Sequence, residues 1–128
     1  MRIMNKFQKL SDTEMELMLI IWGLNKEVTS AELLDIFEKE KGKKWSGQTI
    51  STFLSRMIEK GVLTSNKIGR TNYYKAIVTI DEYRQKEAEG ILNDMYKGSV
   101  KSFLSALYYG KKINKEEINE LKEWFSKK

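Results

Sequence analysis

The spacing of the apolar residues changes twice along this chain, and this change constrains the fold more than any other feature. Residues 12–24, 30–40 and 46–60 carry apolar side chains at intervals of three and four, the period of an amphipathic helix. Residues 62–67 and 71–77 are rich in strand-forming residues and are joined through Gly69, which predicts a hairpin. Helical spacing returns from residue 80. This order predicts a mainly α, α+β winged helix-turn-helix followed by C-terminal helices.

Local signals place the starts of the predicted helices. A capping residue followed three positions later by Glu occurs at positions 11 and 14, 29 and 32, 79 and 82, and 114 and 117. In such a pair each side chain can bind a free backbone amide of the first helical turn. In the first helix we expect Met15, Met18, Leu19 and Trp22 to share the buried face. We expect a domain over residues 1–79 and a helical region over residues 80–128.

Composition excludes several classes of function. The 128 residues contain no Cys and no His, which removes thiol nucleophiles, disulfides and the commonest metal ligands and general bases. No phosphate-binding glycine loop or nucleophile elbow occurs, so we expect neither an enzyme nor a bound metal or cofactor. Residues 1–9 lack an apolar leader, and no stretch is apolar enough for a membrane span. The sequence therefore predicts a cytoplasmic protein with no membrane insertion.

Positive charge is concentrated on the third helix and the hairpin. The net charge is +5, and residues 41–78 contain Glu59 as their one acid. The basic residues of this stretch are Lys41, Lys43, Lys44, Arg56, Lys60, Lys67, Arg70 and Lys75. The face of the third helix that is not apolar carries mostly uncharged hydrogen-bonding side chains. Such a surface is typical of double-stranded DNA binding, with phosphate contacts that position the protein and base contacts that specify the site.

The charge and length of each side chain indicate which part of DNA it would contact. Five residues are expected to neutralise phosphates: Lys43, Lys44, Lys60, Lys67 and Arg70. Five are expected to approach base edges or adjacent phosphates: Gln48, Thr49, Ser51, Thr52 and Arg56. Three alternatives remain: an ordinary solvated surface, a non-specific DNA binder, and a winged-helix adaptor that binds proteins.

The C-terminal helices carry more apolar residues than they can bury among themselves. The candidate dimerisation residues are Ile91, Met95, Val100, Phe103, Leu104, Leu107, Ile118, Leu121, Trp124 and Phe125. A homodimer would cover them and would allow two half-sites to be read. The alternative is that these residues pack against the N-terminal domain.

Four stretches resemble the penicillinase and methicillin-resistance repressors, the BlaI/MecI/CopY family of bacterial regulators. They are residues 10–18 (LSDTEMELM) with the following Ile21-Trp22, residues 45–61 (WSGQTISTFLSRMIEKG), Tyr73-Tyr74, and residues 95–98 (MYKG). The second stretch is the most specific, because it combines three features at fixed spacing: a helix cap, a helix face expected to contact bases, and a Lys-Gly pair where the helix ends. The copper-responsive branch is disfavoured, since its C-terminal cysteines are absent.

The resemblance implies a homodimeric repressor of a pseudo-palindromic operator with half-sites similar to TACA/TGTA. Thr49, Thr52 and Arg56 match the family's DNA-facing positions, whereas Gln48 and Ser51 stand where basic residues are often found. Because Gln can form a bidentate pair with adenine, we expect altered specificity and retained binding.

The resemblance also implies a route of release. In the penicillinase branch a membrane sensor protease system triggers cleavage in the dimerisation region. The equivalent bond here would be Ala106-Leu107, although the best-known members have Asn-Phe at this point. The alternative is that Ala106 and Leu107 are ordinary helix-core residues.

Overall fold

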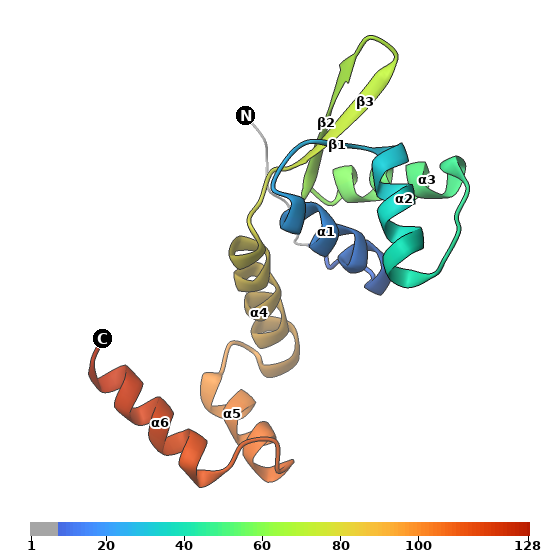
Figure 1. Cartoon of the computed structure of the whole chain (residues 1–128). Coiled ribbons are helices and arrows are strands. Elements are labelled where there is room, and N and C mark those ends of the chain that lie inside the picture. Colours follow the sequence, from blue (N-terminus) through green and yellow to red (C-terminus); the bar gives the residue numbers. More distant parts are fainter. Residues whose placement is uncertain (1–7) are drawn as a thin grey trace. The chain divides into compact units, whose positions relative to one another are not determined.

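A computed structural model describes residues 8–128; residues 1–7, which the sequence assigned to the first domain, lie outside the described residues. The elements follow the predicted order of three helices, a hairpin and further helices (Figure 1). Their bounds are α1 Asp12–Leu24, β1 Val28–Thr29, α2 Ser30–Lys41, α3 Gly47–Glu59, β2 Leu63–Ile68, β3 Thr71–Ala76, α4 Ile80–Tyr96, α5 Val100–Tyr109 and α6 Lys115–Ser126. None of the helices described from residue 8 onward is long and apolar enough to cross a membrane.

The predicted helix starts are confirmed by their caps. Ser11, Thr29 and Asn114 each accept a hydrogen bond from a backbone amide of the first turn, and the Glu three residues later binds the cap residue's own amide. Thr79 makes the same reciprocal pair with Glu82 at the start of α4. Each cap contributes about 1 kcal/mol to the helix that it begins.

The sheet has one strand more than the predicted hairpin. Strands β2 and β3 pair antiparallel, with Lys67 opposite Asn72 and Ile68 opposite Thr71. The short strand β1 adds to β3, with Val28 opposite Tyr74, and gives the sheet order β1-β3-β2. Two residues are too few for a period-two pattern, so the sequence could not indicate this strand.

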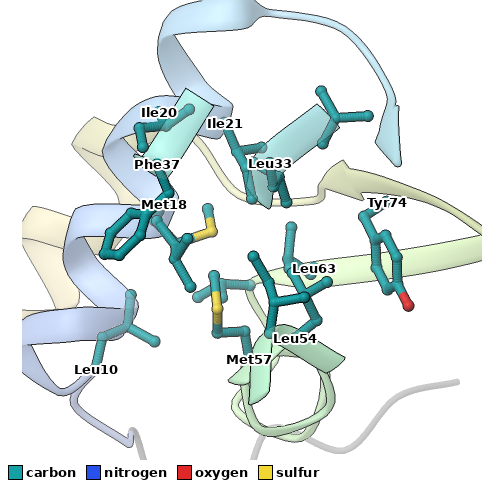
Figure 2. Close-up of a cluster of buried hydrophobic side chains, with 14 of the residues drawn as sticks. Leu10, Met18, Ile20, Ile21, Leu33, Phe37, Leu54, Met57, Leu63 and Tyr74 are labelled. Atoms are coloured by element: carbon teal, nitrogen blue, oxygen red, sulfur yellow. The ribbon is translucent and has the colours of Figure 1, made fainter. Parts of the chain in front are cut away.

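The core of the N-terminal unit lies between α1, α2, α3 and the base of the sheet (Figure 2). Leu17, Met18 and Ile21 contribute from α1, and Leu33 and Phe37 contribute from α2. Further buried side chains come from α3 and the strands: Ile50, Leu54, Met57, Leu63 and Tyr74.

One expected core residue of α1 lies on the outside. The side chain of Leu19 is 47% exposed, whereas Ile20, which is not among the residues expected on the buried face, is buried. The reason is that α1 is apolar around most of its circumference, so spacing alone does not identify the face that the other helices cover.

The chain divides into two units, residues 1–87 and 88–128. The division falls inside α4, later than the boundary after residue 79 that the sequence suggested. Residues 80–87, about the first two turns of α4, belong to the N-terminal unit, where Tyr83 is buried with its ring centroid 6.1 Å from that of Trp22. The Tyr83 hydroxyl accepts a 2.8 Å hydrogen bond from the amide of Leu10.

Candidate nucleic-acid interface

Helix α3 is anchored by one face and exposed by the other. Ile50, Leu54 and Met57 are fully buried against the rest of the N-terminal unit. This anchoring fixes the helix about its axis, and the exposed side then carries the predicted reading residues Gln48, Thr49, Ser51, Thr52 and Arg56. No acid occurs between Gly47 and Ile58, so nothing on this stretch would repel a phosphate backbone.

Two of these hydroxyls already have partners inside the helix. The Ser46 hydroxyl caps the helix by accepting from the Thr49 amide and lies 3.0 Å from the Thr49 hydroxyl. The Thr52 hydroxyl donates to the Gln48 carbonyl at 3.0 Å. Thr52 therefore offers a methyl group and an acceptor oxygen to a ligand, whereas Gln48 and Arg56 offer side-chain donors.

The hairpin of β2 and β3 forms the predicted wing. Gly69 and Arg70 connect the two strands, and the φ of +64° at Gly69 lies in the left-handed region that favours glycine. Arg70 at the tip and Lys67 near the end of β2 are exposed. Lys43 and Lys44 are also exposed and lie in the loop before α3.

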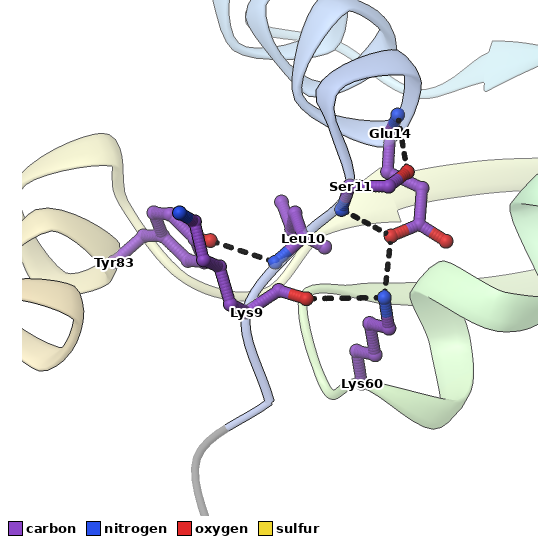
Figure 3. Close-up of polar contacts among 6 residues, drawn as sticks. All are labelled: Lys9, Leu10, Ser11, Glu14, Lys60 and Tyr83. Carbon is purple, nitrogen blue, oxygen red and sulfur yellow. Dashed lines mark hydrogen bonds and ion pairs between the residues drawn. The ribbon is translucent and has the colours of Figure 1, made fainter. Parts of the chain in front are cut away.

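Lys60 differs from the expectation of a phosphate contact. Its ammonium lies 2.6 Å from a carboxylate oxygen of Glu14, whose side chain is 1% exposed, and it also donates to the Lys9 carbonyl at 3.1 Å (Figure 3). Burial raises the pKa of Glu14, but hydrogen bonds from Lys60 and Ser11 outweigh burial and hold that pKa below its ordinary value of 4.5. Lys60 thus neutralises a buried carboxylate, and we leave it out of the candidate interface.

Asn72 is a further candidate contact, which the charge pattern of the sequence did not indicate. It is exposed and pairs with Lys67 across β2 and β3, so the two side chains project from the same face of the wing. Lys75, which pairs with Thr64, belongs to the opposite face. The sequence does carry a signal for Asn72. Pairing residues outward from the Gly69-Arg70 turn places Ile68 opposite Thr71 and Lys67 opposite Asn72.

The C-terminal unit leaves most of its predicted dimerisation residues exposed. Helices α5 and α6 bury no residue, and Met95 and Phe125 are 73% and 64% exposed. A groove of about 780 Å³ lies between these helices, lined by Val100, Leu104, Tyr108, Ile118, Leu121 and Phe125 among others. Phe103, Leu107 and Ile118 are half-buried, and the Phe103 ring contacts Tyr96 at 5.1 Å between centroids. A surface this apolar is typical of a protein interface.

Comparisons with known proteins agree with this arrangement. The penicillinase repressor family model matches residues 10–127. The penicillinase repressor of Bacillus licheniformis is 33% identical over 118 residues, covering 92% of this chain and 90% of that protein. The methicillin resistance regulatory protein MecI of Staphylococcus aureus (strain N315) is 28% identical over 124 residues, covering 97% and 98%.

A solved structure supports the fold of the N-terminal unit. The DNA-binding domain of the repressor BlaI is 34% identical and superposes with a TM-score of 0.52, covering 62% of this chain and 94% of that chain. The family is one of transcriptional repressors and not of enzymes. The match over residues 10–127 includes both the winged helix and the C-terminal helices, and the chain belongs to the penicillinase repressor family.

Proposed function

We propose that this chain is a homodimeric, sequence-specific transcriptional repressor of the cytoplasm that binds a pseudo-palindromic operator through α3 and the wing. The observation that carries this proposal is the exposed face of α3, which presents hydrogen-bonding side chains without a single acid from Gly47 to Ile58. Exposed lysines lie in the loop before the helix, and further exposed basic residues lie on the wing. DNA needs this combination, because phosphate contacts supply affinity and base contacts supply specificity.

Each side chain has a role that follows from its chemistry. Arg56 is suited to a bidentate contact with guanine, and Gln48 to one with adenine. Thr52 can place its methyl group against a thymine methyl, because its proton is bound to the Gln48 carbonyl. Thr49 and Ser51 approach adjacent base edges or phosphates. The phosphate contacts come from Lys43, Lys44, Lys67 and Arg70, with Asn72 beside Lys67.

The partner that covers the C-terminal groove is a second copy of this chain. The groove between α5 and α6 is apolar, and α5 and α6 leave most of the side chains that line it exposed. Burial of apolar surface stabilises by about 25 cal/mol per Å², so covering these side chains favours association. Two wings related by a two-fold axis would contact two half-sites about one helical turn apart.

Release by a membrane sensor protease system would act on the same region. The bond between Ala106 and Leu107 lies inside α5, where the two carbonyls accept hydrogen bonds from the amides of Gly110 and Lys112. Cleavage there would separate α6 from the rest of the chain and remove half of the groove. Because both carbonyls are engaged in helical hydrogen bonds, α5 must open locally before the bond can enter a protease.

Selection of bound sequences from a random duplex pool, followed by footprinting, tests the proposal. Recovery of a two-fold-symmetric site with half-sites about one helical turn apart supports dimeric, sequence-specific repression. Recovery of no motif, with binding that only fades as salt rises, would reduce the basic face to non-specific attraction. Absence of DNA binding would favour the adaptor function. Sedimentation of the free chain over a range of concentrations tests the dimer separately.

A further inference from the structure

A series of aromatic rings leads from the core to the reading face of α3. The Phe37 ring is fully buried and lies 4.2 Å between centroids from the ring of Trp45, in the loop before α3. Trp45 in turn stacks on Phe53 at 5.0 Å with an interplanar angle of 16°. Trp45 and Phe53 are both half-buried. The outer ring, Phe53, is therefore held by packing that reaches into the core.

The guanidinium of Arg56 lies over this outer ring, with its central carbon 5.8 Å from the Phe53 centroid. The two residues are three positions apart on α3, so their side chains are neighbours on the helix surface. A cation over an aromatic face is attracted by the ring's quadrupole. Arg56 forms no ion pair with any residue from 8 to 128.

This mode of support leaves the side chain ready to bind. An ion pair with a carboxylate would occupy the in-plane N–H groups that a base requires, whereas an aromatic face contacts the guanidinium plane and leaves those donors free. Holding a long, flexible side chain before binding also reduces the entropy that is lost when DNA immobilises it. The ring thus restricts Arg56 without consuming its donors.

We propose that Phe53, held in place by Trp45, is a positioning residue that orders Arg56 for base recognition and so contributes to operator discrimination. This inference rests on the proposed function, since it requires that Arg56 reads a base. Discrimination is measured as a ratio, the affinity for the selected operator divided by the affinity for a random duplex of equal length at the same salt concentration. We call this the discrimination ratio.

The test compares three substitutions. Phe53→Leu keeps an apolar side chain but removes the aromatic face, and it lowers the discrimination ratio by about two- to fivefold. Phe53→Tyr keeps the face and restores the wild-type ratio. Ile58→Val is the matched control, because Ile58 is a half-buried apolar residue of the same helix that has no aromatic face to hold Arg56. Thermal unfolding of each variant separates a loss of stability from a loss of discrimination.

A double-mutant cycle identifies Arg56 as the residue through which the ring acts. In an Arg56→Ala background, Phe53→Leu leaves the ratio unchanged. If Phe53→Leu proves too unstable to bind DNA, Trp45→Phe weakens the stack beneath Phe53 and lowers the ratio in the same direction. An unchanged ratio in the folded variants, while the wild type discriminates, would overturn this inference alone. A wild type that does not discriminate would overturn the proposed function and this inference with it.

Discussion

Replacement of Lys60 by Met tests whether this residue stabilises the fold and not the DNA complex. The substitution keeps most of the aliphatic stem but removes the ammonium 2.6 Å from Glu14, leaving a carboxylate that is 1% exposed with the Ser11 amide as its nearest remaining donor. Removal of one partner of a fully buried pair costs about 3–5 kcal/mol. The Lys60 side chain is 23% exposed, so water can partly replace it. We expect a loss of about 2–3 kcal/mol in the free energy of unfolding.

The pH dependence of this loss has a defined sign. In the wild type the pKa of Glu14 is lowered in the folded state, so its ionised form stabilises the fold above pH 4.5, and that contribution disappears as the pH falls through the lowered pKa. In Lys60→Met, burial dominates and the carboxyl takes up a proton at a higher pH. The difference in stability between variant and wild type is therefore largest near neutrality and shrinks on acidification.

Urea unfolding followed by circular dichroism, at pH 7 and at pH 4 and at one protein concentration, measures both effects. Lys67→Met is the matched control, since Lys67 is an exposed lysine of the wing and its loss should change stability by less than about 0.5 kcal/mol. The reasoning is refuted if Lys60→Met is as stable as the control at pH 7, or if its deficit is the same at both pH values.

Three further outcomes concern binding. Lys67→Met should reduce the slope of log affinity against log salt by about 1, whereas Lys60→Met should leave the slope unchanged; a Lys67→Met slope equal to that of the wild type would exclude a phosphate contact of Lys67, and a reduced Lys60→Met slope would return Lys60 to the interface. Arg56→Ala should weaken the free energy of operator binding by about 1–3 kcal/mol and relax discrimination at one base pair; an equal loss of binding to random duplexes would make Arg56 a phosphate contact only. Leu121→Asp and Trp124→Asp should each give monomers with weak operator binding, and an unchanged sedimentation profile would remove those residues from the dimer interface.

The sequence predicted every helix and both hairpin strands of this fold, but not β1, because the signals of the predicted elements are local. A cap at Ser11 or Asn114 acts on amides within three residues, so the helix start can be recognised without knowing what the helix packs against. The Gly69 turn likewise defines the wing and the alternation of its strands. The exposed face of α3 could be predicted for the same reason, since Ile50, Leu54 and Met57 mark its buried side.

Only the tertiary structure determined the features that depend on contacts between residues distant in the chain. Strand β1 exists because Val28 meets Tyr74, and its two residues carry no pattern of their own. Lys60 looked like any exposed lysine until the fold placed it against Glu14, 46 residues away. A charge run identifies which residues are basic, but only the folded chain determines which of them are already neutralised, because an ion pair depends on proximity in space and not on spacing in sequence.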